Sequence, residues 1–179
     1  MLFRSRQLHP IEAEIPRLRR FALALTRDGV LADDIVQDCL ERALAAWASR
    51  RNEASLRPWL FAILHNVWRS RRTRDGNRPD SRPLDDSIDE PTQSGGQWER
   101  LELRDLDRAL GLLPEEQRSL LLLVVVEGLS YEEAARVQEV PLGTVMSRLL
   151  RAREKLRRLT DGEPPHMGDD ARPHLRRVK

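Results

Sequence analysis

The sequence predicts an all-α protein made of two small helical domains that a flexible linker joins. Apolar residues recur every third or fourth position through most of the chain, and no segment shows the alternation of a β-strand. Residues 76–97 interrupt this pattern with three prolines, three glycines and many charged residues, which predicts an acidic flexible linker. A chain of 179 residues is long enough for two small domains around such a linker.

The first domain, residues 10–75, is predicted to contain three helices. In 11–27 and 31–48 the apolar residues share one face, and the second of these segments carries its acidic residues on the opposite face. The third helix, 56–74, has a second apolar strip beside its core face and ends in a run of arginines. Prolines near the starts of the first and third segments suit the first turn of a helix, where a missing N–H costs least.

The second domain is predicted to cover residues 98–160. A helix that starts after Pro114 and ends at Gly128 is apolar on all sides, which predicts that it is buried at the centre of this domain. Residues 161–179 show no periodicity and are predicted to form a disordered tail.

Charge alternates along the chain, although the formal net charge of the whole chain is only +2. Residues 28–41 carry −5 and residues 85–107 carry −6, whereas residues 64–82 carry +4 and residues 141–159 carry +5. Two separate basic segments predict two contacts with a polyanion, and the acidic segments predict contacts with something else. The alternative is that all four are solvated helix faces.

Several function classes are excluded by what the sequence lacks. The longest apolar run, Leu120 to Val126, has seven residues, far fewer than the roughly 20 that span a bilayer. The N-terminus has no signal-peptide core, so we expect a cytoplasmic protein. The single cysteine, Cys39, excludes an internal disulfide, and its apolar neighbours predict a packing role. Because no nucleophile, base or metal-ligating cluster is present, we expect no enzyme activity, no cofactor and no metal site.

Residues 130–159 are typical of a helix-turn-helix, the motif that places its second helix in the DNA major groove. Ser130, followed three residues later by Glu133, predicts a capping box at the first helix. In the second helix Val145 faces the core. The residues predicted to face base edges and phosphates are Thr144, Ser147, Arg148 and Arg151. The alternative is a basic helix that is only solvated.

Four stretches of the sequence carry a resemblance to a known family. They are, in chain order, ADDIVQDCLERALAAW, LRPWLFAILHNVWRSRR, LPEEQRSLLLLVVVEGLSYEEAA and GLSYEEAARVQEVPLGTVMSRLLRAREKL. The first two resemble regions 2.1–2.2 and 2.3–2.4, and the last two resemble region 4, of RNA polymerase sigma factors of the extracytoplasmic-function (ECF) group in the sigma-70 family. The resemblance covers roughly residues 10–160 and implies a sigma region 2 helical bundle followed by a region 4 helix-turn-helix.

The resemblance also implies partners. They are core RNA polymerase, through its beta-prime clamp helices and beta flap, promoter DNA, and an anti-sigma factor; no membrane contact is expected. The polymerase set is Asp33, Asp34, Gln37, Asp38 and Arg42. The −10 set, for the promoter element where the duplex first opens, is Asn66, Trp68, Arg69, Arg71 and Arg72. The −35 set is Thr144, Ser147, Arg148, Arg151, Arg153 and Lys155.

The chain departs from the family pattern at two positions of the helix-turn-helix. Glu139 stands in the turn where Gly is usual, and a glutamate there costs about 1 kcal/mol if the position needs a positive φ. Met146 replaces a usual Lys, which removes one possible phosphate contact.

Three functions are therefore compared. The first is a dissociable sigma subunit that directs promoter-specific transcription initiation. The second is a sigma-like interaction protein that sequesters an anti-sigma factor; such proteins usually carry a receiver domain and need no DNA-contacting bases, whereas this chain keeps both basic segments. The third is an ordinary helix-turn-helix regulator, which leaves the first domain and its acidic face unexplained. Transcription with purified core polymerase distinguishes the first from the other two.

Overall fold

The computed structural model describes residues 10–50, 55–74 and 106–160. Within these ranges every regular element is helical, as the sequence predicts. The predicted linker at 76–97 and the predicted tail at 161–179 lie outside the described residues. None of the helices described is both long and apolar enough to span a bilayer.

The first domain has the three predicted helices. They are α1 (Ile15–Thr26), α2 (Gly29–Ala45) and α3 (Leu56–Arg74), with the short 3₁₀ turns η1 (Glu12–Glu14) and η2 (Trp47–Ser49). Helix α1 ends where Arg27 takes a left-handed φ of 57° and its N–H bonds to the Leu23 carbonyl at 2.8 Å. The carboxylate of Asp28 then accepts the Leu31 N–H at 3.0 Å and caps α2, so α1 and α2 are joined by a tight turn.

The described part of the second domain begins with a helical stretch at residues 106–111. Its other elements are α5 (Glu115–Leu121), the π-helical segment η3 (Leu122–Val126), α6 (Tyr131–Gln138) and α7 (Leu142–Thr160). The predicted capping box is confirmed: the Ser130 hydroxyl accepts the Glu133 N–H at 3.2 Å, and the Glu133 carboxylate accepts the Ser130 N–H at 2.9 Å. Helices α6 and α7 pack against each other as a helix-turn-helix.

The prediction that the helix before Gly128 is apolar and buried on all sides is wrong at its end. Leu120 and Leu123 are fully buried, but Val125 and Val126 are 64% and 46% exposed. The chain widens into a π-helix here, with the Glu127 N–H bonded to the Leu122 carbonyl at 3.0 Å. The extra residue in the turn shifts the register, so the valines face outward while the Glu127 side chain faces inward.

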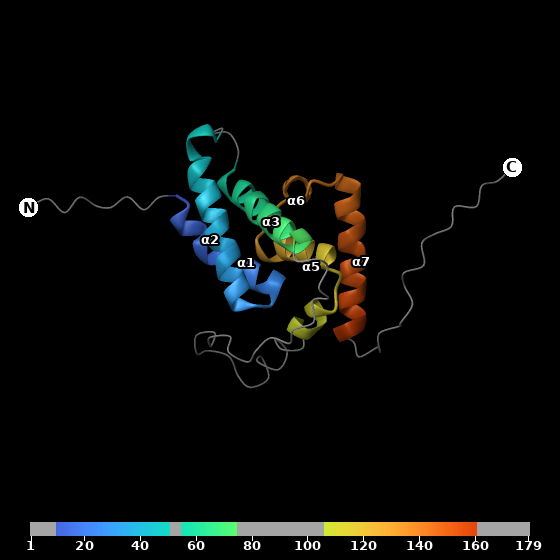
Figure 1. Cartoon of the computed structure of the whole chain (residues 1–179). Helices are drawn as coiled ribbons and strands as arrows, with labels where there is room; N and C mark the ends of the chain where they lie inside the picture. The colour runs from blue at the N-terminus through green and yellow to red at the C-terminus, as the bar shows by residue number, and fades with distance from the viewer. Residues whose placement is uncertain (1–9, 51–54, 75–105, 161–179) are drawn as a thin grey trace, which may run out of the picture.

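Helix α3 lies between the two domains (Figure 1). It packs against α1 and α2 on one side and against α6 on the other, and the buried apolar residues of both domains form one continuous cluster. This explains the second apolar strip that the sequence shows on α3. Phe61 meets Phe21 of α1 edge to face, with the ring centroids 5.1 Å apart, whereas Trp68 contacts α5.

Polar contacts of α1 also join the domains. The fully buried carboxylate of Glu127 accepts a hydrogen bond from Arg20 at 2.9 Å and lies 3.6 Å from Arg17. The guanidinium of Arg118, itself 3% exposed, donates to the Leu25 carbonyl at 2.9 Å. A buried carboxylate without a cation would be costly, so these pairs hold the second domain on α1.

The predicted packing role of Cys39 is confirmed. Its side chain is fully buried between α2 and α3, and the thiol lies 3.5 Å from the Leu60 carbonyl. Burial raises the pKa of Cys39 to about 12, and Arg42 offsets only part of this shift. The thiol therefore stays protonated and is a poor nucleophile.

Candidate functional site

The polymerase set lies along the polar face of α2. Asp33, Asp34, Gln37 and Arg42 are exposed, and Asp38 is half-buried. The carboxylate of Asp33 accepts two hydrogen bonds from Arg19 of α1, at 2.8 and 3.2 Å. Gln37 donates to Glu41, one turn further along, at 3.1 Å. The amphipathic pattern of this helix thus places the five side chains on one accessible surface, as a docking face requires.

Arg71 of α3 links the polymerase set to the −10 set. Its Nε and Nη2 atoms donate to Asp38 at 3.1 and 2.7 Å, and its Nη1 atom donates to Asp34 at 3.4 Å. The hydrogen bond with Asp38 contributes most to raising the pKa of Arg71 above its ordinary value, so the guanidinium stays charged. Sequence reasoning placed Arg71 on DNA, but here it braces α3 against α2.

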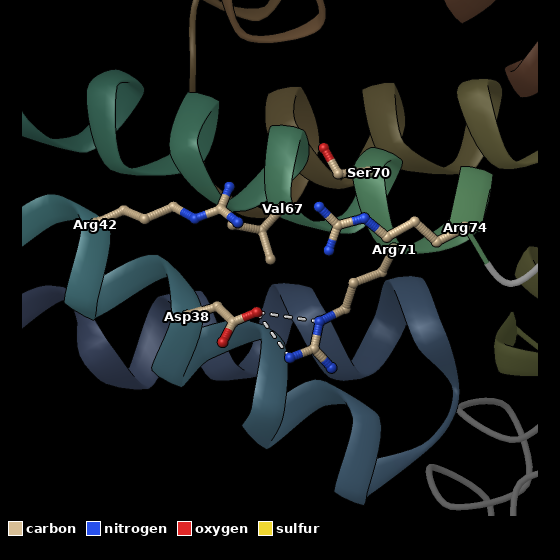
Figure 2. Close-up of a pocket in the computed structure, with 6 residues that line it drawn as sticks. All are labelled: Asp38, Arg42, Val67, Ser70, Arg71 and Arg74. Carbon is tan, nitrogen blue, oxygen red and sulfur yellow. Dashed lines mark hydrogen bonds and ion pairs between the residues drawn. The ribbon is translucent and has the colours of Figure 1, made fainter.

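An open pocket of about 300 Å³ lies between α2 and α3 (Figure 2). It is lined by Asp38, Arg42, Val67, Ser70, Arg71 and Arg74. Figure 2 shows the guanidinium groups of Arg42 and Arg74 extending toward each other, while Arg71 turns to Asp38. Three guanidiniums against one carboxylate give this surface a net positive charge at the edge of the −10 set.

The −10 set lies on the last three turns of α3 but is not uniformly accessible. Arg69 and Arg72 are exposed, Asn66 and Arg71 are half-buried, and Trp68 is only 5% exposed. The indole N–H of Trp68 donates to the Glu115 carboxylate of α5 at 2.7 Å. In this arrangement Trp68 cannot serve as a stacking surface for a base, although the resemblance placed it in the −10 set.

Sequence reasoning missed an aromatic cluster at the start of α3. The rings of Trp47 and Trp59 lie 6.3 Å apart, and the Arg50 guanidinium lies 5.5 and 5.6 Å from their centroids. Trp59 is half-buried in this cluster, where its ring packs against Trp47 and the Arg50 guanidinium. A signal was available, since Trp47 closes the apolar stripe of the preceding helix.

His65 lies on the face of α3 that contacts the second domain. Burial, and then the charge of Arg69, lower the pKa of His65 to about 4. The imidazole is therefore neutral at physiological pH and is part of the packed interface between the domains.

The −35 set is divided over two sides of α7. Thr144, Arg148, Arg151 and Lys155 follow one another at helical spacing, with Ser147 beside them. Arg153 lies on the other side of the buried stripe and donates to the Tyr131 hydroxyl at 3.3 Å. Arg148 is engaged by Glu116 of α5 at 2.6 Å, whereas Arg151 is exposed.

Two further side chains belong to the exposed face of α7. Met146 and Leu150 are 51% and 67% exposed and lie one helical turn apart, next to Ser147 and Arg151. Sequence reasoning treated Met146 only as a lost phosphate contact. Side-chain accessibility, which depends on how α7 packs on α5 and α6, was needed to find this apolar pair.

The turn between α6 and α7 places Glu139 in a left-handed conformation, with φ 56° and ψ 43°. The Val140 N–H reaches the Ala135 carbonyl at 3.1 Å, as in the helix ending that usually takes glycine. The condition for strain at this position, a positive φ, is therefore met. The Glu139 carboxylate lies 3.7 Å from Arg69 of the first domain.

We expect Glu139→Gly to raise the free energy of unfolding by about 1 kcal/mol, because glycine adopts this φ without steric cost. The ion pair with Arg69 that is lost is exposed on both sides and contributes less than about 1 kcal/mol. Urea denaturation measures the difference. Glu139→Ala is the matched control, since it removes the same carboxylate but keeps Cβ; if Gly and Ala variants are equally stable, the turn is not strained.

Comparison with known protein families gives two matches that divide the chain as the fold does. Residues 11–65 match the family described as the Sigma2 domain of PhyR, and residues 103–156 match the family described as Sigma-70, region 4. Together they cover more than half of the chain.

Curated relatives extend the similarity over nearly the whole length. The chain is 39% identical over 165 residues to the ECF RNA polymerase sigma factor EcfG of Rhodopseudomonas palustris (strain TIE-1), covering 89% of each chain. This protein belongs to the ECF sigma factors of the sigma-70 family. It is 34% identical over 134 residues to the ECF RNA polymerase sigma-E factor of Escherichia coli (strain K12), covering 69% of this chain and 70% of that one. As an ECF sigma factor it is a non-enzymatic protein that directs transcription initiation.

Solved structures show the same fold in related proteins. This ECF sigma factor is similar to the sigma factor RpoE of Bartonella quintana, solved in complex with the anti-sigma factor NepR, with a TM-score of 0.72, 33% identity and coverage of 86% of this chain and 96% of that one. It also resembles CnrH, solved with the cytosolic domain of CnrY, with a TM-score of 0.63, 27% identity and 86% coverage of each chain.

Proposed function

We propose that this ECF sigma factor binds core RNA polymerase through the polar face of α2, engages the −10 element through α3 and reads the −35 element as duplex through α7. The observation that carries the proposal is the exposed face of α7, where Ser147 and Arg151 lie within the first three turns of a helix-turn-helix recognition helix. Region 2, residues 10–75, and region 4, residues 98–160, are the two functional units. We place its action in the cytoplasm, with the polymerase and promoter DNA.

The side chains on α7 fit duplex recognition. Arg151 offers the fork of donors that suits a guanine edge or a phosphate. Met146 and Leu150, exposed on the adjoining side of α7 toward Arg153, offer apolar contacts of the kind that distinguish the methyl group of thymine. We therefore include them in the −35 contact surface, with Arg153 in a supporting position against Tyr131.

Run-off transcription with purified core polymerase on a bank of promoter fragments tests this function. The expected result is that the protein binds core and directs initiation at a subset of fragments. A protein that binds neither core nor promoter but captures an anti-sigma factor would instead be the sequestering sigma mimic.

The polymerase contact has a sharper test on α2. We expect Gln37→Ala combined with Arg42→Ala to weaken binding to core about tenfold, because arginine is enriched among the interface residues whose truncation costs more than about 1 kcal/mol. Within the described ranges these two side chains hold no ion pair with another helix, so the variant leaves the fold intact. Asp34 and Asp38 are less informative since they hold Arg71.

Surface-plasmon measurements of core binding, with −35 duplex binding as the internal control, give the readout. Core affinity that stays at the wild-type value would assign the polymerase contact elsewhere. Loss of both activities would indicate unfolding and not a lost docking face.

We further propose that an anti-sigma factor similar to NepR binds this chain. The support is the similarity to RpoE of Bartonella quintana, solved with NepR, and to PhyRSL of Sphingomonas sp. Fr1, also solved with NepR, at 25% identity and a TM-score of 0.61. Co-purification of the full chain with a NepR-like protein, in competition with core polymerase, tests this partner.

A further inference from the structure

The pocket between α2 and α3 holds more positive charge than the carboxylate in its wall can pair. Its charged lining residues are Asp38, Arg42, Arg71 and Arg74. Arg71 is held by Asp38 at 2.7 Å and by Asp34, outside the lining, at 3.4 Å. Within residues 10–50, 55–74 and 106–160, neither the Arg42 nor the Arg74 guanidinium has an ion-pair or hydrogen-bond partner. These two groups are therefore the cations that the pocket offers to a ligand.

The guanidinium groups of Arg42 and Arg74 converge from two helices. Figure 2 shows them extending toward each other along α3, while Arg71 turns away to Asp38. Ser70, one turn before Arg74, adds a hydroxyl group to the same lining. Like charges at close range repel, so this arrangement is most favourable when an anion lies between the two groups.

This pocket lies on a different side of α3 from the exposed arginines of the −10 set. Arg69 and Arg72 face the second domain, where acidic side chains lie against them. Arg74 faces α2, because residues two apart on a helix point roughly 200° apart. A ligand between Arg42 and Arg74 therefore binds cations that lie outside the −10 set.

The charge of the pocket favours a terminal phosphate group. A phosphate monoester carries about −1.5 to −2 at neutral pH, which matches two guanidinium groups, whereas each phosphodiester of a DNA backbone carries −1. Guanidinium forks hold phosphate oxygens bidentately, and a serine hydroxyl donates one further hydrogen bond. The volume of about 300 Å³ is at the small end of the range for ligand pockets, so the phosphate fits together with part of a small molecule.

The neighbouring side chains of α2 disfavour a long polyanion. Asp34 lies one turn before Asp38, and Glu41 directly precedes Arg42. Both Asp34 and Glu41 are exposed, so a nucleic-acid strand that continued from the pocket across α2 would bring its phosphates against carboxylates. A compact ligand contacts the two guanidinium groups without this repulsion.

We propose that the pocket between α2 and α3 is a binding site for the terminal phosphate group of a small ligand, held between Arg42 and Arg74 with the Ser70 hydroxyl as a further donor. Arg42 also belongs to the polymerase set. A ligand that engages Arg42 therefore weakens binding to core polymerase; this consequence, unlike the site itself, rests on the proposed function.

The site is tested by titrating the isotopically labelled full chain with methyl phosphate and with dimethyl phosphate at constant ionic strength. Nuclear magnetic resonance signals of the backbone amides and of the arginine Nε–H groups give a dissociation constant for each probe. Methyl phosphate is expected to shift the signals of Ser70 and Arg74 and to bind about tenfold more tightly than dimethyl phosphate, because it carries more charge. Equal affinity for the two probes would indicate a site for a nucleic-acid backbone and overturn the proposal.

Substitutions at the two arginines locate the bound phosphate. Arg42→Ala and Arg74→Ala are each expected to weaken methyl phosphate binding about tenfold, since each removes one guanidinium fork. Arg74→Lys keeps the charge but loses the fork, so its affinity should lie between those of Arg74→Ala and the wild type. Both arginines are exposed, and circular dichroism checks that the variants stay folded.

Arg19→Ala is the matched control, because it removes one exposed arginine from the first domain at a distance from the pocket lining. It should bind methyl phosphate like the wild type. If Arg19→Ala loses as much affinity as Arg42→Ala and Arg74→Ala, methyl phosphate responds to net charge alone and the proposed site is wrong.

Competition with core polymerase tests the consequence of binding. Saturating methyl phosphate is expected to lower the affinity of the wild type for core several-fold and to leave the affinity of Arg74→Ala unchanged. An equal loss in both proteins would place the effect on the polymerase and overturn this consequence. A filled pocket with wild-type core affinity would support the phosphate site and contradict the polymerase contact proposed for Arg42.

Discussion

Phe61→Ala is expected to lower the free energy of unfolding by about 3–5 kcal/mol. The Phe61 side chain is fully buried on α3, and its ring meets Phe21 of α1 edge to face at an interplanar angle of 78°. Truncation removes the transfer free energy of the ring, leaves a cavity between α1 and α3, and breaks an aromatic pair worth about 1 kcal/mol. Urea denaturation followed by far-UV circular dichroism measures the loss.

Val125→Ala is the matched surface control, since Val125 is 64% exposed in η3. Its expected effect is within about 0.5 kcal/mol. A loss of more than about 1 kcal/mol at Val125 would show that this segment is buried on all sides, as its apolar sequence alone suggests. A small loss at Phe61 would contradict the packing of α3 against α1.

The helices and their ends could be predicted from the sequence because their signals are local. Ser130 and Glu133 cap α6 through backbone groups three residues away, and Pro16 fits the first turn of α1 by its own geometry. For Glu139 the sequence supports only a conditional prediction, a cost if the turn needs a positive φ, and the structure supplies the condition with φ 56°. None of these inferences needed knowledge of which helices pack together.

The contacts between the domains could not be predicted, because they join residues far apart in the sequence. Glu127 lies 107 positions from Arg20, and Glu115 lies 47 positions from Trp68. Alternating charge predicted external partners for every charged segment, yet part of that charge pairs inside the chain. The π-helical register of η3 was equally hidden, since its effect is to turn Glu127 toward α1, and a run of leucines and valines carries no sign of it.

The residues predicted to read the −35 element all lie on α7, but their surroundings differ. Arg151 is exposed, whereas Arg148 is 25% exposed and paired with Glu116. Helical spacing alone puts both on one stripe, and only the position of α5 beside α7 separates them. A loss of DNA affinity on substitution of Arg151 therefore reports a DNA contact directly. A loss on substitution of Arg148 also includes the effect of breaking its pair with Glu116.

Arg148→Ala combined with Arg151→Ala is expected to weaken binding to the −35 duplex by about 2–4 kcal/mol, or about 30- to 1,000-fold. Each guanidinium that leaves a phosphate or a guanine edge should also lower the slope of log affinity against log salt by about one. Fluorescence anisotropy over a salt series, with the upstream element selected in the run-off experiment, gives both quantities. Arg19→Ala, which removes one positive charge from α1, should leave both at their wild-type values.

Glu116→Gln separates the two roles open to Arg148, because it breaks the pair between α5 and α7 but keeps the arginine. If Arg148 binds DNA, releasing it from Glu116 should maintain or tighten −35 binding, and Arg148→Ala should weaken it. If Arg148 only braces α7 against α5, the two single variants should weaken binding alike, and the salt slope should change only with Arg151→Ala. The ordering of these two affinities therefore decides whether the paired arginine belongs to the DNA contact surface or to the support of the recognition helix.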